Sequence, residues 1–94
     1  LMVYDNFMRG LPKWLKECQS DASLTLVRHD IINPLPEKMD DFQYIIHAAS
    51  IASPIYYRQH PIETMDANVN GLRYLLEYCL KQNNKGNPVE GFIF

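Results

Sequence analysis

Two acidic residues stand where they could bind a nucleotide. Asp5 closes the apolar run 1–4, and Asp30 follows a second predicted strand over residues 24–29, which is apolar over 24–27. An aspartate at the end of a buried strand can accept hydrogen bonds from the 2′- and 3′-hydroxyls of a ribose, and it repels a 2′-phosphate. At Asp30, a carboxylate could accept the proton of an adenine amino group while the Ile31 backbone contacts the ring. Either acid can also be an ordinary turn residue.

Small and polar residues provide a second candidate region. Three small residues follow the apolar segment 42–47 directly: Ala48, Ala49 and Ser50. Without bulky side chains, the backbone there can approach a pyrophosphate or a ribose, although a strand end with little to pack is the simpler interpretation. Asn68 and Gly71 lie within a helical pattern, where both residue types are unfavourable. Asn68 could face a cofactor, and Gly71 would let the helix pack close to a sheet.

Residues 53–58 show no regular period and have two interpretations. They could be a surface loop with an aromatic anchor. They could also contact a substrate, because Arg58 beside the Tyr57 hydroxyl suits an anionic, hydroxylated ligand such as a sugar acid. The three histidines lack the spacing of metal ligands, so we expect no metal site: His29, His47 and His60.

The hydrophobic pattern predicts the elements that position these residues. We expect strands over residues 1–5, 24–29, 42–47 and 91–94, with helices over 11–19 and 64–82. Residues 31–41 contain two prolines and indicate a loop with room for one helical turn. This alternation predicts an α/β fold with a parallel sheet. In such sheets ligands bind beyond the carboxyl ends of the strands, where both acids and the small residues lie.

The composition excludes several classes of protein. The 94 residues include nine basic and eleven acidic ones, with a net charge of −2. They contain neither the basic patch of a nucleic-acid-binding protein nor a polybasic membrane anchor, and no apolar run approaches the roughly 20 residues that cross a bilayer. Cys18 and Cys79 are far apart in the sequence, which favours free thiols and, without a signal-peptide pattern, a cytoplasmic location.

Taken in order, these segments resemble the extended short-chain dehydrogenase/reductase family, the NAD-dependent epimerases and dehydratases of nucleotide sugars. The matching motifs are DNF at 5–7 with Gly10, HDI at 29–31, HAAS at 47–50, SPIYY at 53–57 and NVNGLRYLLEYC at 68–79. They cover nearly the whole chain. The resemblance implies a Rossmann-type, doubly wound parallel sheet in three αβα layers, with NAD as the cofactor.

The resemblance also implies a role for each candidate residue. Asp5 would bind the adenosine ribose, Asp30 would hold the adenine, and Asn68 would lie near the nicotinamide. The residues implied to contact the cofactor are Asp5, Asn6, Phe7, Asp30, Ile31, Ala48, Ala49, Ser50 and Asn68. Tyr57 and Arg58 would contact the substrate sugar.

We expect the chain to be a fragment of an NAD-binding domain. The family's Gly-rich phosphate loop would precede residue 1, while its catalytic Ser/Thr, its Tyr-x-x-x-Lys pair and its substrate domain would follow residue 94. No catalytic residue is therefore expected within the chain. In the strand order 3-2-1-4-5, the missing first strand would lie between the strands at 1–5 and 42–47. The sheet should then split into two halves with open edges.

Within the family, residues 52–71 (ASPIYYRQHPIETMDANVNG) are most similar to the UDP-glucuronate decarboxylases. The similarity implies UDP-glucuronate as substrate, oxidised at C4, decarboxylated and reduced again by a homodimeric enzyme. A dTDP-glucose 4,6-dehydratase or a sugar-nucleotide 4-epimerase is the alternative, because these enzymes share the oxidation step. Alternatives of other classes are a non-catalytic dinucleotide-binding module and a flavodoxin-like signalling domain.

Overall fold

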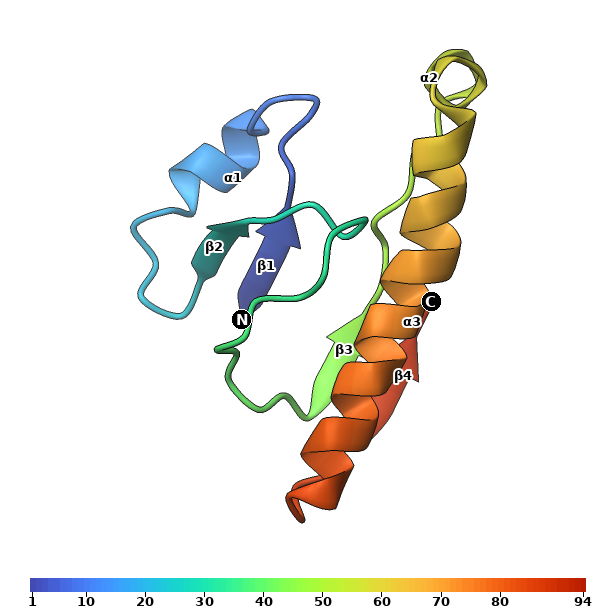
Figure 1. The fold of residues 1–94 in the computed structure, drawn as a ribbon. Coiled ribbons are helices and arrows are strands. Elements are labelled where there is room, and N and C mark those ends of the chain that lie inside the picture. The colour runs from blue at the N-terminus through green and yellow to red at the C-terminus, as the bar shows by residue number, and fades with distance from the viewer. The chain divides into compact units, whose positions relative to one another are not determined.

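The computed structural model describes all 94 residues, which divide into two compact units, Leu1–Ile31 and Ile32–Phe94. Each unit contains one pair of parallel strands, and no strand joins the two pairs (Figure 1). The α/β class and the partial Rossmann-type sheet are therefore confirmed. The predicted split of the sheet into two halves is also observed.

The first unit is a single β-α-β motif. It consists of β1 (Met2–Asp5), α1 (Lys13–Glu17) and β2 (Thr25–Arg28). Asp5 lies opposite Arg28 in the parallel register, at the carboxyl ends of both strands. The helix begins later than the predicted 11–19, because Pro12 has an extended backbone with ψ at 146° and precedes the first helical residue, and it ends earlier, at Glu17. Leu15, on α1, is buried.

The second unit contains the longer crossover. It consists of β3 (Tyr44–Ile46), α2 (Pro54–Gln59), α3 (Pro61–Asn84) and β4 (Gly91–Ile93). In the parallel register, Tyr44 lies opposite Gly91 and Ile46 lies opposite Ile93.

Two helical segments differ from the prediction. Residues 54–59 form a helix, so the interpretation of this aperiodic segment as a loop is wrong. The long helix begins at Pro61 and ends at Asn84, beyond both ends of the predicted 64–82. Proline accounts for where both helices begin: Pro54 and Pro61 each occupy the first helical turn, where proline is favourable because no intrahelical N–H bond is lost.

Helix α3 runs antiparallel to β3. Near the start of the helix, the carbonyl oxygen of Ala67 lies 3.1 Å from Nε2 of His47, just after β3. Near its end, the Gln82 side chain bonds to the backbone of Phe42, just before β3. The start of α3 therefore lies at the carboxyl end of β3.

Few apolar side chains are buried. Only Leu15 and Ala67 form the buried apolar core. One face of the β3–β4 pair is open, with Tyr44 70%, Ile46 71% and Ile93 64% exposed, although both faces of a parallel sheet are normally covered. No helix combines the length and the apolar character needed to cross a membrane.

Candidate functional site

The loop after β1 makes a tight turn around its own polar side chains. Oδ1 of Asp5 accepts a hydrogen bond from the Phe7 N–H at 2.6 Å, and Oδ1 of Asn6 accepts one from the Met8 N–H at 2.9 Å. These are two consecutive Asx turns. Phe7 takes a left-handed backbone with φ at 52°, and Gly10, also left-handed, donates its N–H to the Phe7 carbonyl. The turn leaves the Asp5 side chain exposed at the end of the strand.

The loop after β2 is tied to this turn. Nδ2 of Asn6 donates a hydrogen bond to Oδ2 of Asp30 at 3.0 Å, across 24 positions of sequence. The N–H of His29 donates to the Asp5 carbonyl at 3.0 Å and extends the strand pairing by one residue. The structure therefore brings the polar residues of both loops together, with the half-buried Ile31 directly after them.

A hollow of about 470 Å³ lies at this end of the strands. It is lined by Asn6, Met8, Arg28, His29 and Asp30. Three of these residues were not predicted from the sequence to bind a cofactor: Met8, Arg28 and His29. The strand register would have indicated Arg28, since it lies opposite Asp5, but the hydrophobic pattern does not specify register.

His29 lines the hollow but forms no hydrogen bond through its buried ring nitrogen. Its Nε2 is buried and has no hydrogen-bond partner. Its ring meets that of Tyr4 edge-on, with the centroids 6.3 Å apart. The ring therefore packs as an aromatic side chain.

The second unit holds the other candidate cofactor residues. Nδ2 of Asn68 donates to Oγ of Ser50 at 2.9 Å and to the carbonyl of Thr64 at 2.7 Å. The bond to the carbonyl four residues earlier gives an asparagine within a helix a local partner. Ala48 and Ala49 are exposed just after β3, so their backbone is accessible.

Tyr57 and Arg58 lie on α2 and are both exposed. No hydrogen bond or ion pair joins either side chain to Ser50 or Asn68. The candidate cofactor residues themselves fall into both compact units, with positions 5–7 and 30–31 in the first and positions 48–50 and 68 in the second.

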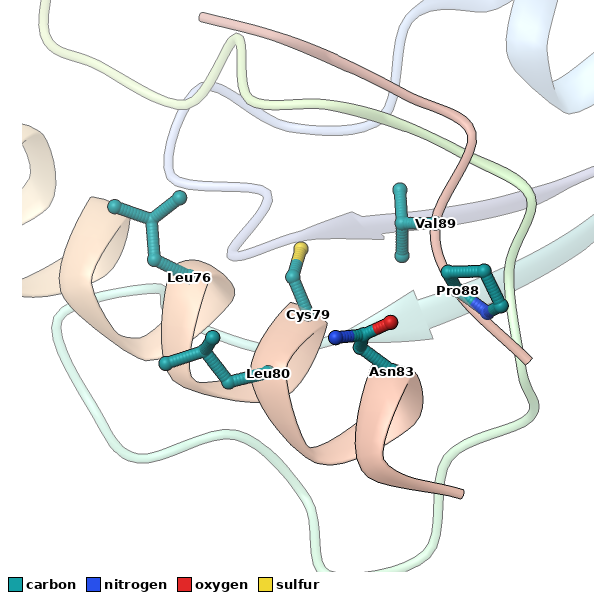
Figure 2. A pocket seen from close by; sticks show the side chains of 6 residues that line it. All are labelled: Leu76, Cys79, Leu80, Asn83, Pro88 and Val89. Carbon is teal, nitrogen blue, oxygen red and sulfur yellow. The ribbon is translucent and has the colours of Figure 1, made fainter. Parts of the chain in front are cut away.

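Another hollow, of about 360 Å³, lies near the C-terminal end of α3 (Figure 2). Its lining residues are Leu76, Cys79, Leu80, Asn83, Pro88 and Val89. Burial raises the pKa of the Cys79 thiol above its usual value. The Asn83 amide and the Cys79 thiol are its only polar side-chain groups, and the other lining side chains are apolar. The hollow therefore lacks the convergent polar groups of a nucleotide site.

The family assignment follows from comparison with known proteins. Residues 14–94 match the NAD dependent epimerase/dehydratase family. The chain belongs to this family. The match confirms the resemblance stated above and agrees with the Rossmann-like arrangement of the parallel strands. Positions 5–7 precede the first matched residue, so their interpretation depends on the residue pattern and the loop geometry.

Several curated relatives of this family member are UDP-glucuronic acid decarboxylases. Enzyme 1 of Arabidopsis thaliana is 34% identical over 76 residues, which are 81% of this chain and 17% of the relative. Enzyme 5 of the same plant is 36% identical over 81% of this chain and 21% of the relative. Enzyme 1 of Danio rerio is 34% identical over 79% of this chain and 17% of the relative. The chain thus spans about a fifth of these relatives or less. No solved structure gives a significant match.

Proposed function

We propose that these residues form part of the NAD-binding domain of a UDP-glucuronate decarboxylase. The observation that carries the proposal is the identity of 34–36% to decarboxylases over four-fifths of the chain. Residues 52–71 independently favour the same enzymes by their motif. In this proposal the whole enzyme oxidises the sugar at C4, releases the carboxylate as carbon dioxide and reduces the ketone again.

The first unit would hold the adenosine half of NAD. Its geometry fits this role, because the exposed Asp5 carboxylate ends β1 and the hollow beside it is lined by Asn6 and Asp30. Asp5 would accept hydrogen bonds from the ribose hydroxyls, and Asp30 would accept one from the adenine amino group, with the Ile31 backbone beside the ring. Phe7, in its left-handed conformation, would continue the loop around the ribose.

The second unit would hold the nicotinamide half. Ala48 and Ala49 present an accessible backbone after β3, and the Ser50 hydroxyl is oriented by Asn68. Bound NAD would supply the hydride acceptor for the sugar, while these residues would orient the ribose and pyrophosphate. The start of α3 lies at the same end of β3, which supports placing Asn68 near the nicotinamide.

The substrate would be contacted from α2. Arg58 is exposed and forms no ion pair in the structure, so its guanidinium is available for a carboxylate such as that of glucuronate. Tyr57, the preceding residue, would offer its hydroxyl to the sugar. The acid-base residues of the reaction would lie outside these 94 residues.

The proposal extends to a cytoplasmic homodimer. Both cysteines are free in the structure, which agrees with a reducing compartment. An apolar strip along α3 supports burial against a second subunit, since Met65, Val69, Leu76 and Leu80 are all exposed.

Product analysis of the full-length protein tests the proposed activity. With UDP-glucuronate and NAD, we expect carbon dioxide together with UDP-xylose or its 4-keto precursor. Unchanged UDP-glucuronate, with turnover of dTDP-glucose or of another sugar nucleotide, would make the protein a dehydratase or an epimerase. Tight NAD binding without turnover of any sugar nucleotide would indicate a non-catalytic module.

A further inference from the structure

We infer that Asn6 is a positioning residue, which orients the Asp30 carboxylate toward the adenine instead of contacting the cofactor with its own side chain. The inference rests on the proposed function, because it concerns the adenosine end of the same site. It depends on the two hydrogen bonds of the Asn6 side chain.

The orientation of the Asn6 amide is determined by its backbone neighbour. The Met8 N–H can only donate, so the atom 2.9 Å from it must be the amide oxygen of Asn6. The amide nitrogen then necessarily faces Asp30, whose Oδ2 lies 3.0 Å away. A reversed amide would place two donors together at Met8 and two acceptors together at Asp30.

The hydrogen bond between Asn6 and Asp30 connects two loops that the chain places 24 residues apart. A hydrogen bond to a carboxylate is charge-assisted and stronger than one between neutral groups. The Asn6 side chain is itself held by the Met8 N–H, which donates to its amide oxygen. The Asp30 carboxylate is therefore held in one preorganised orientation, which lowers the entropic cost of binding the adenine amino group.

This arrangement makes a specific prediction about the base. The adenine amino group donates a hydrogen bond, whereas hypoxanthine carries an acceptor oxygen at the same position. A correctly oriented Asp30 should favour NAD over nicotinamide hypoxanthine dinucleotide. Loss of the orienting bond should weaken NAD binding and leave binding of the hypoxanthine analogue nearly unchanged.

The test is calorimetric titration of both dinucleotides into the full-length protein and its Asn6 variants. Asn6→Asp keeps an acceptor for the Met8 N–H, and so preserves the turn, but has no donor for Asp30. We expect its Kd for NAD to rise about tenfold, the loss expected for one charge-assisted bond, while its Kd for the analogue changes less than about twofold, which is too small for the loss of such a bond. Asn33→Ala, an exposed asparagine in the loop after β2, is the matched control and should change neither.

A double variant supplies the rescue. In Asn6→Asp with Asp30→Asn, the amide introduced at position 30 can donate to the carboxylate introduced at position 6 and still accept from adenine. We expect NAD affinity to return toward the wild-type value. Equal weakening of both dinucleotides in Asn6→Asp, or no recovery in the double variant, would overturn the inference. A wild-type protein that binds neither dinucleotide would instead overturn the proposed function, and this inference with it.

Discussion

The side chain of Gln82 and the backbone of Phe42 form a reciprocal pair of hydrogen bonds. Nε2 of Gln82 donates to the Phe42 carbonyl at 2.7 Å, and Oε1 accepts from the Phe42 N–H at 2.8 Å. The same amide donates to the Asn87 carbonyl and accepts from the Tyr78 hydroxyl. Gln82 is only 1% exposed. It therefore joins the last turns of α3 to the segments that precede β3 and β4.

We expect Gln82→Ala to lower the free energy of unfolding by about 2–4 kcal/mol, because it removes a buried side chain and leaves the partly buried N–H and carbonyl of Phe42 without their partners. Chemical denaturation of the full-length protein measures the change. Gln59→Ala is the matched control, since Gln59 is exposed at the end of α2, and it should change stability by less than about 0.5 kcal/mol. Equal effects of the two substitutions would contradict a structural role for the Gln82 amide.

Asp5→Asn should raise the Kd for NAD about tenfold, because a neutral amide accepts weaker hydrogen bonds from the ribose hydroxyls. It should also reduce discrimination against NADP, since the repulsion of the 2′-phosphate is removed. Fluorescence titration with both cofactors measures these changes. Asp21→Asn is the matched control, because Asp21 accepts the N–H two residues later, from Ser23, in the same way. If both variants bind NAD equally well, Asp5 does not contact the ribose.

The 94-residue chain alone should not melt cooperatively as a monomer. Isolated two-stranded sheets are marginally stable, and the buried apolar core consists of Leu15 and Ala67 alone. Scanning calorimetry combined with analytical ultracentrifugation tests this expectation. We expect a broad, non-cooperative transition or self-association. A sharp, two-state transition of a monomer would show that the two strand pairs are sufficient by themselves.

The Cys79 thiol should become reactive only at alkaline pH. Burial raises its pKa from the usual 9.0, because the thiolate is less well solvated at this position. The alkylation rate of Cys79, followed by mass spectrometry, should therefore reach half its maximum above pH 9.0. The exposed Cys18 provides an internal comparison. Half-maximal alkylation of Cys79 below this pH would contradict the effect of burial.

The same shift has a consequence for stability. The folded state binds the Cys79 proton more tightly than the unfolded chain does, so its stabilising contribution is present below the unfolded pKa. This contribution is lost as the pH rises through the higher folded value. Denaturant titrations of the full-length protein from pH 8 to pH 11 should show the free energy of unfolding decline as the pH rises. The Cys79→Ser variant should show a smaller decline.

The hydrophobic pattern alone was sufficient to locate all four strands and both main helices, because burial imposes periods that a sequence displays directly. It also placed Asp5, Asp30 and the small residues 48–50 at strand ends. The helix at 54–59 was missed, because a short exposed helix has no buried face to impose a period. The family resemblance was equally accessible, since its motifs are local.

Tertiary structure alone decided which distant groups meet. The bonds from Asn6 to Asp30, from Asn68 to Ser50 and from Gln82 to Phe42 each join residues 18 to 40 positions apart. No local preference encodes these contacts, because a side-chain amide can pair with any polar partner that the fold brings within reach. The order of residue types along the chain was enough to determine its α/β fold class, its family and the positions of the acids at its strand ends. The strand register and the direction of α3 determined how its polar groups are held.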